Sequence, residues 1–101
     1  MTRFELIHIN KVKPLEGRWL RLWFSNGAIK DVNLAPVLQR GVLEPIGSKR
    51  ELFEQVRVNP ESRTIEWPGD IDLDPVVLYG TFEPASGIQL ERRIVQEPAA
   101  A

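Results

Sequence analysis

The segment over residues 67–79 most constrains the fold, because turn and helix-start signals follow one another in it. Pro68-Gly69-Asp70 is a turn cluster, since proline fixes φ and glycine supplies the positive φ of tight turns. Asp74 stands directly before Pro75, and an acceptor side chain followed by proline is typical of a helix start. We therefore predict a chain reversal after Trp67 and a short helix from Pro75, capped by Asp74 and ended by Gly80.

Three carboxylates alternate along this segment, at Asp70, Asp72 and Asp74. Calcium loops also place oxygen ligands at alternate positions, but they need a glycine at the sixth position and a glutamate at the twelfth. Counted from Asp70, those positions hold Pro75 and Thr81. We interpret the three carboxylates as turn and cap residues and expect no metal site. Solvated carboxyl groups are ionised at neutral pH, which also makes them poor general acids.

The composition excludes several kinds of chemistry. A chain of 101 residues is enough for one small domain. The absence of cysteine removes disulfides, thiolate nucleophiles and cysteine-bound zinc, and the single histidine, His8, is interpreted as structural. Thirteen basic and fourteen acidic residues are interleaved, so no general attraction to nucleic acid is expected. With no leader, no membrane span and no cofactor signature, we expect a cytoplasmic protein that carries no cofactor.

Residues 4–12 and 18–24 are rich in β-formers and predict two strands. Alternation along the second strand places one set of side chains on the core face: Leu20, Leu22 and Phe24. The opposite set is Trp19, Arg21 and Trp23. Because tryptophan and arginine are enriched at interface hot spots, this set is the candidate interaction surface, unless helices of the same domain cover it.

Ser25-Asn26-Gly27 predicts a hairpin, for which two loop forms are possible. A two-residue turn would set core residues opposite polar ones. A three-residue loop with Gly27 in a left-handed bulge position shifts the pairing by one residue. We predict the bulged loop, with these cross-strand pairs: Leu20 with Val32 and Arg21 with Asp31.

The remaining elements are short. Asn33 is a suitable cap for a helix over residues 34–38 that Gly41 closes, and residues 48–51 fit a capping box that starts a second helix at Ser48. Strands are expected over residues 56–59 and 63–67. Residues 83–87 have the composition of a linker, and residues 88–95 are ambiguous between a strand and a helix.

These elements predict an α+β fold, with a mainly antiparallel sheet of hairpins and two or three short helices in a single small domain. We expect the domain to occupy residues 1–80. Residues 81–101 are expected to form a C-terminal extension that is partly extended or flexible.

Over residues 5–80 the chain resembles a bacterial domain-of-unknown-function family, numbered two-four-four-two. The resemblance rests on an F-S-x-G hairpin, on the segments 32–34 and 52–53, and on the pattern W-P followed by D-L-x-P and L-Y. Its motif residues are Asn26, Gly27, Trp67, Pro68, Asp72, Leu73, Pro75, Leu78 and Tyr79. Two departures are Asn33, where the family usually has Asp, and Gly69-Asp70-Ile71, where it usually has Asn-Gly-Ala.

The resemblance implies an α+β fold and carries over no catalytic residues. It also implies a genetic context, because members are often encoded beside a second small protein in pairs that resemble toxin and antitoxin. Some members are fused to a helix-turn-helix domain. We expect no such domain after Gly80, and direct reading of DNA loses support accordingly.

Two functional hypotheses follow. The first is a non-enzymatic protein-protein interaction module, including the antitoxin-like member of a two-gene pair, that uses Trp19, Arg21 and Trp23 to bind a partner or a second copy. Residues 88–95 are a second candidate surface. The alternative is a nucleic-acid-binding or transcription-regulatory accessory domain, in which the same residues and Lys30 contact bases and phosphates.

Overall fold

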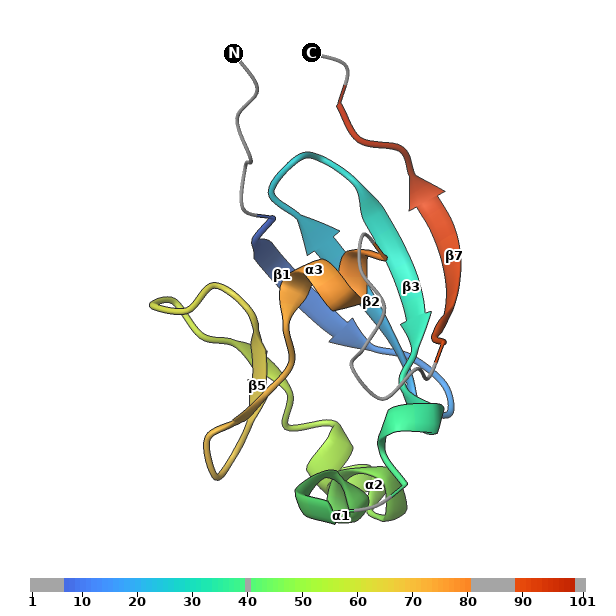
Figure 1. The fold of residues 1–101 in the computed structure, drawn as a ribbon, viewed down its shortest axis with the longest axis vertical. Helices are drawn as coiled ribbons and strands as arrows, with labels where there is room; N and C mark the ends of the chain where they lie inside the picture. Colours follow the sequence, from blue (N-terminus) through green and yellow to red (C-terminus); the bar gives the residue numbers. More distant parts are fainter. Residues whose placement is uncertain (1–6, 40, 81–88, 100–101) are drawn as a thin grey trace.

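The computed structural model describes residues 7–39, 41–80 and 89–99 of the chain, which form an α+β domain as predicted (Figure 1). Four strands make one antiparallel sheet in the order β1-β2-β3-β7: β1 Ile9–Pro14, β2 Trp19–Phe24, β3 Ile29–Asn33 and β7 Glu91–Gln96. Three short strands make a second antiparallel sheet: β4 Arg57–Val58, β5 Ile65–Trp67 and β6 Ile71–Asp72. The helices are η1 Ala35–Val37, η2 Gly41–Leu43, α1 Glu44–Ser48, α2 Arg50–Phe53 and α3 Pro75–Tyr79.

The β2–β3 hairpin has the predicted register. Leu20 lies opposite Val32 and Arg21 opposite Asp31. The loop has three residues, and Gly27 adopts φ +90°, where side chains are strained. The Gly27 amide donates to the carbonyl of Phe24 at 3.1 Å, which closes the turn. The bulged loop is therefore confirmed.

The core lies on the inner face of the larger sheet, where the predicted side chains of β2 are at most 2% exposed. Helix α3 lies over the larger sheet (Figure 1), and buried residues of the second sheet, α1 and α2 belong to the same core cluster. Trp67 is 1% exposed, and its indole nitrogen donates to the carbonyl of Phe53 at 3.0 Å. On α3, Leu78 is buried and the Tyr79 ring meets the Phe24 ring edge-on, with centroids 5.0 Å apart. The C-terminal end of α3 thus packs directly on the β2–β3 hairpin.

The predicted capping box at Ser48 is wrong. Ser48 is the last residue of α1, which begins earlier, at Glu44-Pro45, with proline in the first turn. Lys49 then adopts an extended conformation, with φ −118° and ψ 109°, and α2 starts after it without a side-chain cap. The break allows both Ile46 on α1 and Phe53 on α2 to be fully buried. Tertiary burial decides this boundary over the local capping pattern.

Several other boundaries differ from those predicted. Strand β1 starts at Ile9 and includes Pro14, whereas residues 4–6 of the predicted strand lie outside the described residues. The helix after Asn33 is only a 3₁₀ turn, and its N-cap is Leu34, without a side-chain cap, so the predicted cap at Asn33 is wrong. The Asn33 side chain instead accepts a hydrogen bond from the Ala35 amide at 3.0 Å just before the turn. Gly41 begins η2 instead of closing the preceding helix. Strand β6, which the sequence analysis did not predict, forms because the turn at 68–70 pairs β5 with the segment after it.

Helix α3 starts at Pro75 and ends before Gly80, which has φ +105°, as predicted. The chain reverses after Trp67 through Gly69 and Asp70, both with positive φ. The capping role of the Asp74 side chain stays a prediction.

Beyond α3, the predicted linker at 83–87 lies outside the described residues. The segment 88–95 was ambiguous between a strand and a helix. Its described part is a strand from residue 91 onward. Leu90 is 6% exposed and joins the core, and the Ala99 amide donates to the carbonyl of Asn26 at 2.8 Å. The division of the chain at residue 80 stays a prediction.

Candidate functional site

The face of the larger sheet opposite the core carries the residues singled out as an interaction surface. Residues directly opposite in antiparallel strands project to the same side, so the register defines the members of this outer face. They are Lys11, Lys13, Trp19, Arg21, Trp23, Ile29, Asp31, Asn33, Glu91, Arg93 and Gln96. The outer face therefore holds four cationic side chains and two carboxylates, a surplus of two positive charges on a chain whose net charge is −1.

Asp31 occupies the centre of the outer face. Its carboxylate accepts hydrogen bonds from Arg21 Nε at 2.8 Å and from the second Arg21 nitrogen at 3.1 Å. Arg93 approaches the same carboxylate at 3.5 Å from β7. Asp31 is only 3% exposed, because these two arginines cover it. The hydrogen bond to Asp31 raises the pKa of Arg21, which favours the charged guanidinium.

Two cations also hold the tryptophan rings. The Arg93 guanidinium lies 4.1 Å from the centroid of Trp19, and the Lys11 ammonium lies 4.7 Å from that of Trp23. Both contacts are within the range of cation–π attraction. The three predicted surface residues are half-buried: Trp19, Arg21 and Trp23. The side chains that contact them, Lys11, Asp31 and Arg93, belong to strands of the same sheet. The predicted residues therefore share one face, with their side chains fixed in place.

Sequence reasoning missed Lys11 and Arg93 as members of this face. Lys11 belonged to a predicted strand whose faces were not assigned, and Arg93 lay in a segment that was ambiguous between strand and helix. The available signal was the run of charged residues at 91–93, but the face on which each side chain lies is defined only once β7 is paired with β3. Lys30, in contrast, lies on the other side of the sheet, because it pairs with the buried Leu22.

Two motif residues, Asn26 of the hairpin and Tyr79 of α3, connect these two elements. The Asn26 side-chain amide donates to the Tyr79 hydroxyl at 2.9 Å. Lys30 donates to the Tyr79 carbonyl at 2.8 Å, and its ammonium lies 3.6 Å from the centroid of the Tyr79 ring. Burial lowers the pKa of Lys30, neighbouring Arg92 lowers it further, and Glu97 opposes both effects. These contacts give Asn26 and Tyr79 a structural role, because they join the hairpin to the end of α3.

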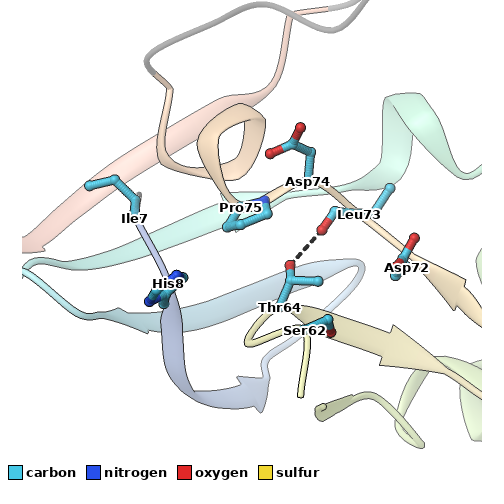
Figure 2. A pocket seen from close by; sticks show the side chains of 8 residues that line it. All are labelled: Ile7, His8, Ser62, Thr64, Asp72, Leu73, Asp74 and Pro75. Carbon is cyan, nitrogen blue, oxygen red and sulfur yellow. Dashed lines mark hydrogen bonds between the residues drawn. The ribbon is translucent and has the colours of Figure 1, made fainter. Parts of the chain in front are cut away.

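Three further motif residues, Asp72, Leu73 and Pro75, border an open groove of about 480 Å³ (Figure 2). Its lining consists of Ile7, His8, Ser62, Thr64, Asp72, Leu73, Asp74 and Pro75. Figure 2 shows His8 on the segment before β1 and the two carboxylates across the groove from it, on the segment leading to α3. The buried Thr64 hydroxyl donates to the carbonyl of Leu73 and ties that segment to the start of β5.

The three alternating carboxylates are not gathered into one cluster. Asp72 and Asp74 line the groove, whereas Asp70 lies in the β5–β6 turn with φ +60°. The described ranges 7–39, 41–80 and 89–99 contain no group of three or more acidic, histidine or cysteine side chains placed to hold a metal ion. Nor does any helix in those ranges have the length and apolar character needed to cross a membrane.

Comparison with known proteins gives one match. A family model described as "Protein of unknown function (DUF2442)" matches residues 9–84, which include every motif residue named above. The family resemblance drawn from the sequence is thereby confirmed. No curated protein and no solved structure matches the chain.

Proposed function

The chain belongs to the DUF2442 family of proteins of unknown function, and we propose that it is a non-enzymatic module that binds a protein partner through its outer face. One observation carries the proposal. Trp19 and Trp23 stand half-exposed on a sheet face, each with a cation held against its ring. Large aromatic side chains with neighbouring arginine are the residues that contribute most to protein binding.

The contacts within the outer face favour binding because they reduce its cost. A side chain that is already fixed loses little conformational freedom when a partner arrives. Asp31 is already paired with Arg21, so a partner that covers it leaves no unpaired carboxylate. The surplus of positive charge favours a partner surface that combines apolar area with carboxylates.

The family resemblance supplies a specific form of this proposal. In that form the chain is the antitoxin-like member of a two-gene pair, and its partner in the cytoplasm is the small protein encoded beside it. Association of two copies through the outer face is the competing form. The two forms differ in the mass of the assembly, so they can be separated directly.

The test is co-expression with the product of the neighbouring gene, followed by size-exclusion chromatography with light scattering. We expect a complex that Trp19→Ser and Trp23→Ser each abolish. Val42→Ser is the matched control, because Val42 is a 74% exposed apolar residue on η2, and it should leave the complex intact. A wild-type monomer that captures no partner, or a complex that survives both tryptophan substitutions, contradicts the proposal.

The same face supports a second candidate function, single-stranded nucleic-acid binding. The observation in its favour is the combination of two tryptophans with four cations on one sheet face. Bases stack on such aromatic side chains, and the cations neutralise phosphates. Binding of this kind weakens steeply as salt is raised. A mixed oligonucleotide pool that shows no binding even at low salt removes this candidate.

A further inference from the structure

We propose that the outer edge of β7, which pairs with no further strand among the described residues, accepts an extended, acidic segment of a partner protein as a fifth strand of the larger sheet. This inference rests on the proposed function in that the partner is a protein. It differs in using the edge of the sheet and its backbone, whereas the proposed function uses side chains of the outer face. Strand addition of this kind is a common mode of peptide recognition.

The two edges of the sheet are not equivalent. At one edge, the Ile9 amide of β1 already donates to the carbonyl of Arg63 at 2.8 Å, and the strand ends in Pro14. At the other edge, β7 has one neighbour among the described residues, β3 (Figure 1). An edge strand presents unpaired backbone donors and acceptors along its outer side.

β7 has the properties of a receptive edge. It is six residues long and contains no proline. Ile94 is 59% exposed and Val95 is 47% exposed, and they are two of the three large exposed apolar residues in the described ranges. The irregularity in its pairing with β3 lies at one end, next to Ile29, and residues 91–94 pair regularly.

The strand is held in place from its other side. Arg92 donates to the carbonyl of Leu78 at 3.0 Å and to that of Val77 at 2.6 Å, which ties β7 to the end of α3. Gln96 donates to the carbonyl of Gly27 at 2.7 Å. An edge that is already ordered loses little conformational entropy when a further strand is added.

Charge decides the class of the occupant. Arg92 and Arg93 are successive residues of the strand, so they project to opposite faces. Arg93 shares the outer face with Glu91, whereas Arg92 is bonded to the end of α3. Two copies paired antiparallel around these residues would set an arginine of one strand opposite an arginine of the other, and like charges across a strand pair are destabilising. A segment that alternates carboxylates with apolar side chains would instead place acidic groups beside Arg93 and apolar ones beside Ile94.

The probe is a fluorescent peptide of about eight residues, enough to span the strand, in which Glu alternates with Val. Binding is measured by fluorescence anisotropy, and its location by amide shifts in nuclear magnetic resonance spectra of the labelled protein. We expect shifts along residues 91–96. Replacing Glu by Lys in the peptide should weaken binding about ten-fold or more, and N-methylation of alternate peptide amides should abolish it.

Two protein variants complete the test. Ile94→Glu should abolish binding of the acidic peptide, while Val42→Glu, with the same charge change at an exposed site on η2, should not. Failure of the wild-type protein to bind the peptide overturns the inference, as does binding that survives N-methylation with shifts confined to the Trp19 and Trp23 indoles. The second result would leave the proposed function standing. A dimer that Ile94→Glu dissociates would also overturn it, by assigning the edge to a second copy.

Discussion

At the scale of single residues, Asp31 organises the outer face. It is nearly inaccessible although it projects from the face opposite the core, because Arg21 and Arg93 cover it. Arg93 in turn lies over Trp19. One carboxylate therefore sets the positions of two arginines and, through them, of a tryptophan. This chain of contacts gives the surface a fixed shape before any partner is present.

Gly27 provides a test of the hairpin at the same scale. Its φ of +90° strains any β-branched residue, and a Cβ at this position would lie 3.1 Å from the backbone nitrogen and the Cβ of Ala99. We expect Gly27→Val to lower the free energy of unfolding by about 1–3 kcal/mol. Urea denaturation measures the change. Gly27→Asn is the control, because asparagine adopts the left-handed conformation more readily, and equal losses in both variants would contradict the explanation.

At the scale of elements, arginines connect pieces of secondary structure that are too short to be stable alone. Arg18 donates to the carbonyl of Gly47 at 2.9 Å, and Arg50 donates to that of Leu15 at 2.7 Å. These bonds attach α1 and α2 to the β1–β2 connection. Arg92 performs the same role between β7 and α3. Loss of one such bond should loosen two elements together.

Arg92→Met tests this coupling. The substitution keeps an unbranched side chain but removes the donors to the carbonyls of Val77 and Leu78 at the end of α3. Because hydrogen bonds from a charged group are among the stronger ones, we expect a loss of about 1.5–3 kcal/mol in the free energy of unfolding. Hydrogen exchange should quicken in α3 and in β7 alike. Unchanged exchange in α3 would show that the two elements are not coupled, and Arg92→Lys should give an intermediate loss.

Glu66 gives the second sheet a dependence on pH. Hydrogen bonds from Asn59, at 2.9 Å, and from Arg57, at 2.8 Å, lower the pKa of Glu66 below its ordinary value. Because the folded-state pKa is the lower one, this stabilisation is present above the unfolded-state pKa and is lost as pH falls through the folded-state pKa. Urea midpoints measured from about pH 7 to pH 3 should therefore fall less in Glu66→Gln than in the wild type. Parallel curves for the two proteins would contradict this assignment.

Local patterns predicted some elements well and others poorly, for physical reasons. The β2–β3 register follows from side-chain alternation and one glycine, and α3 follows from a proline and a glycine at its ends. The break at Lys49 could not be predicted in this way, because it depends on where Ile46 and Phe53 are buried. The same holds for the candidate site. Trp19, Arg21 and Trp23 share a face by alternation alone, whereas Arg93 reaches them only through the pairing of distant strands.

At the scale of the whole molecule, the larger sheet separates two environments. Its inner face carries the core, to which α3 and buried residues of the second sheet contribute (Figure 1). Its outer face carries a surplus of positive charge on a chain with net charge −1. The groove lined by Asp72 and Asp74 is bounded instead by the segments before β1 and α3. The molecule therefore presents its aromatic, cationic surface apart from its acidic groove.

The central claim is that Trp19 and Trp23 stand on a face open to a partner, and acrylamide quenching of tryptophan fluorescence tests it most directly. The third tryptophan, Trp67, is 1% exposed and serves as an internal reference. We predict that the wild-type protein has a readily quenched component and that the double variant Trp19→Phe, Trp23→Phe, which retains only Trp67, has none. Wild-type emission as resistant to acrylamide as that of the double variant would contradict the account.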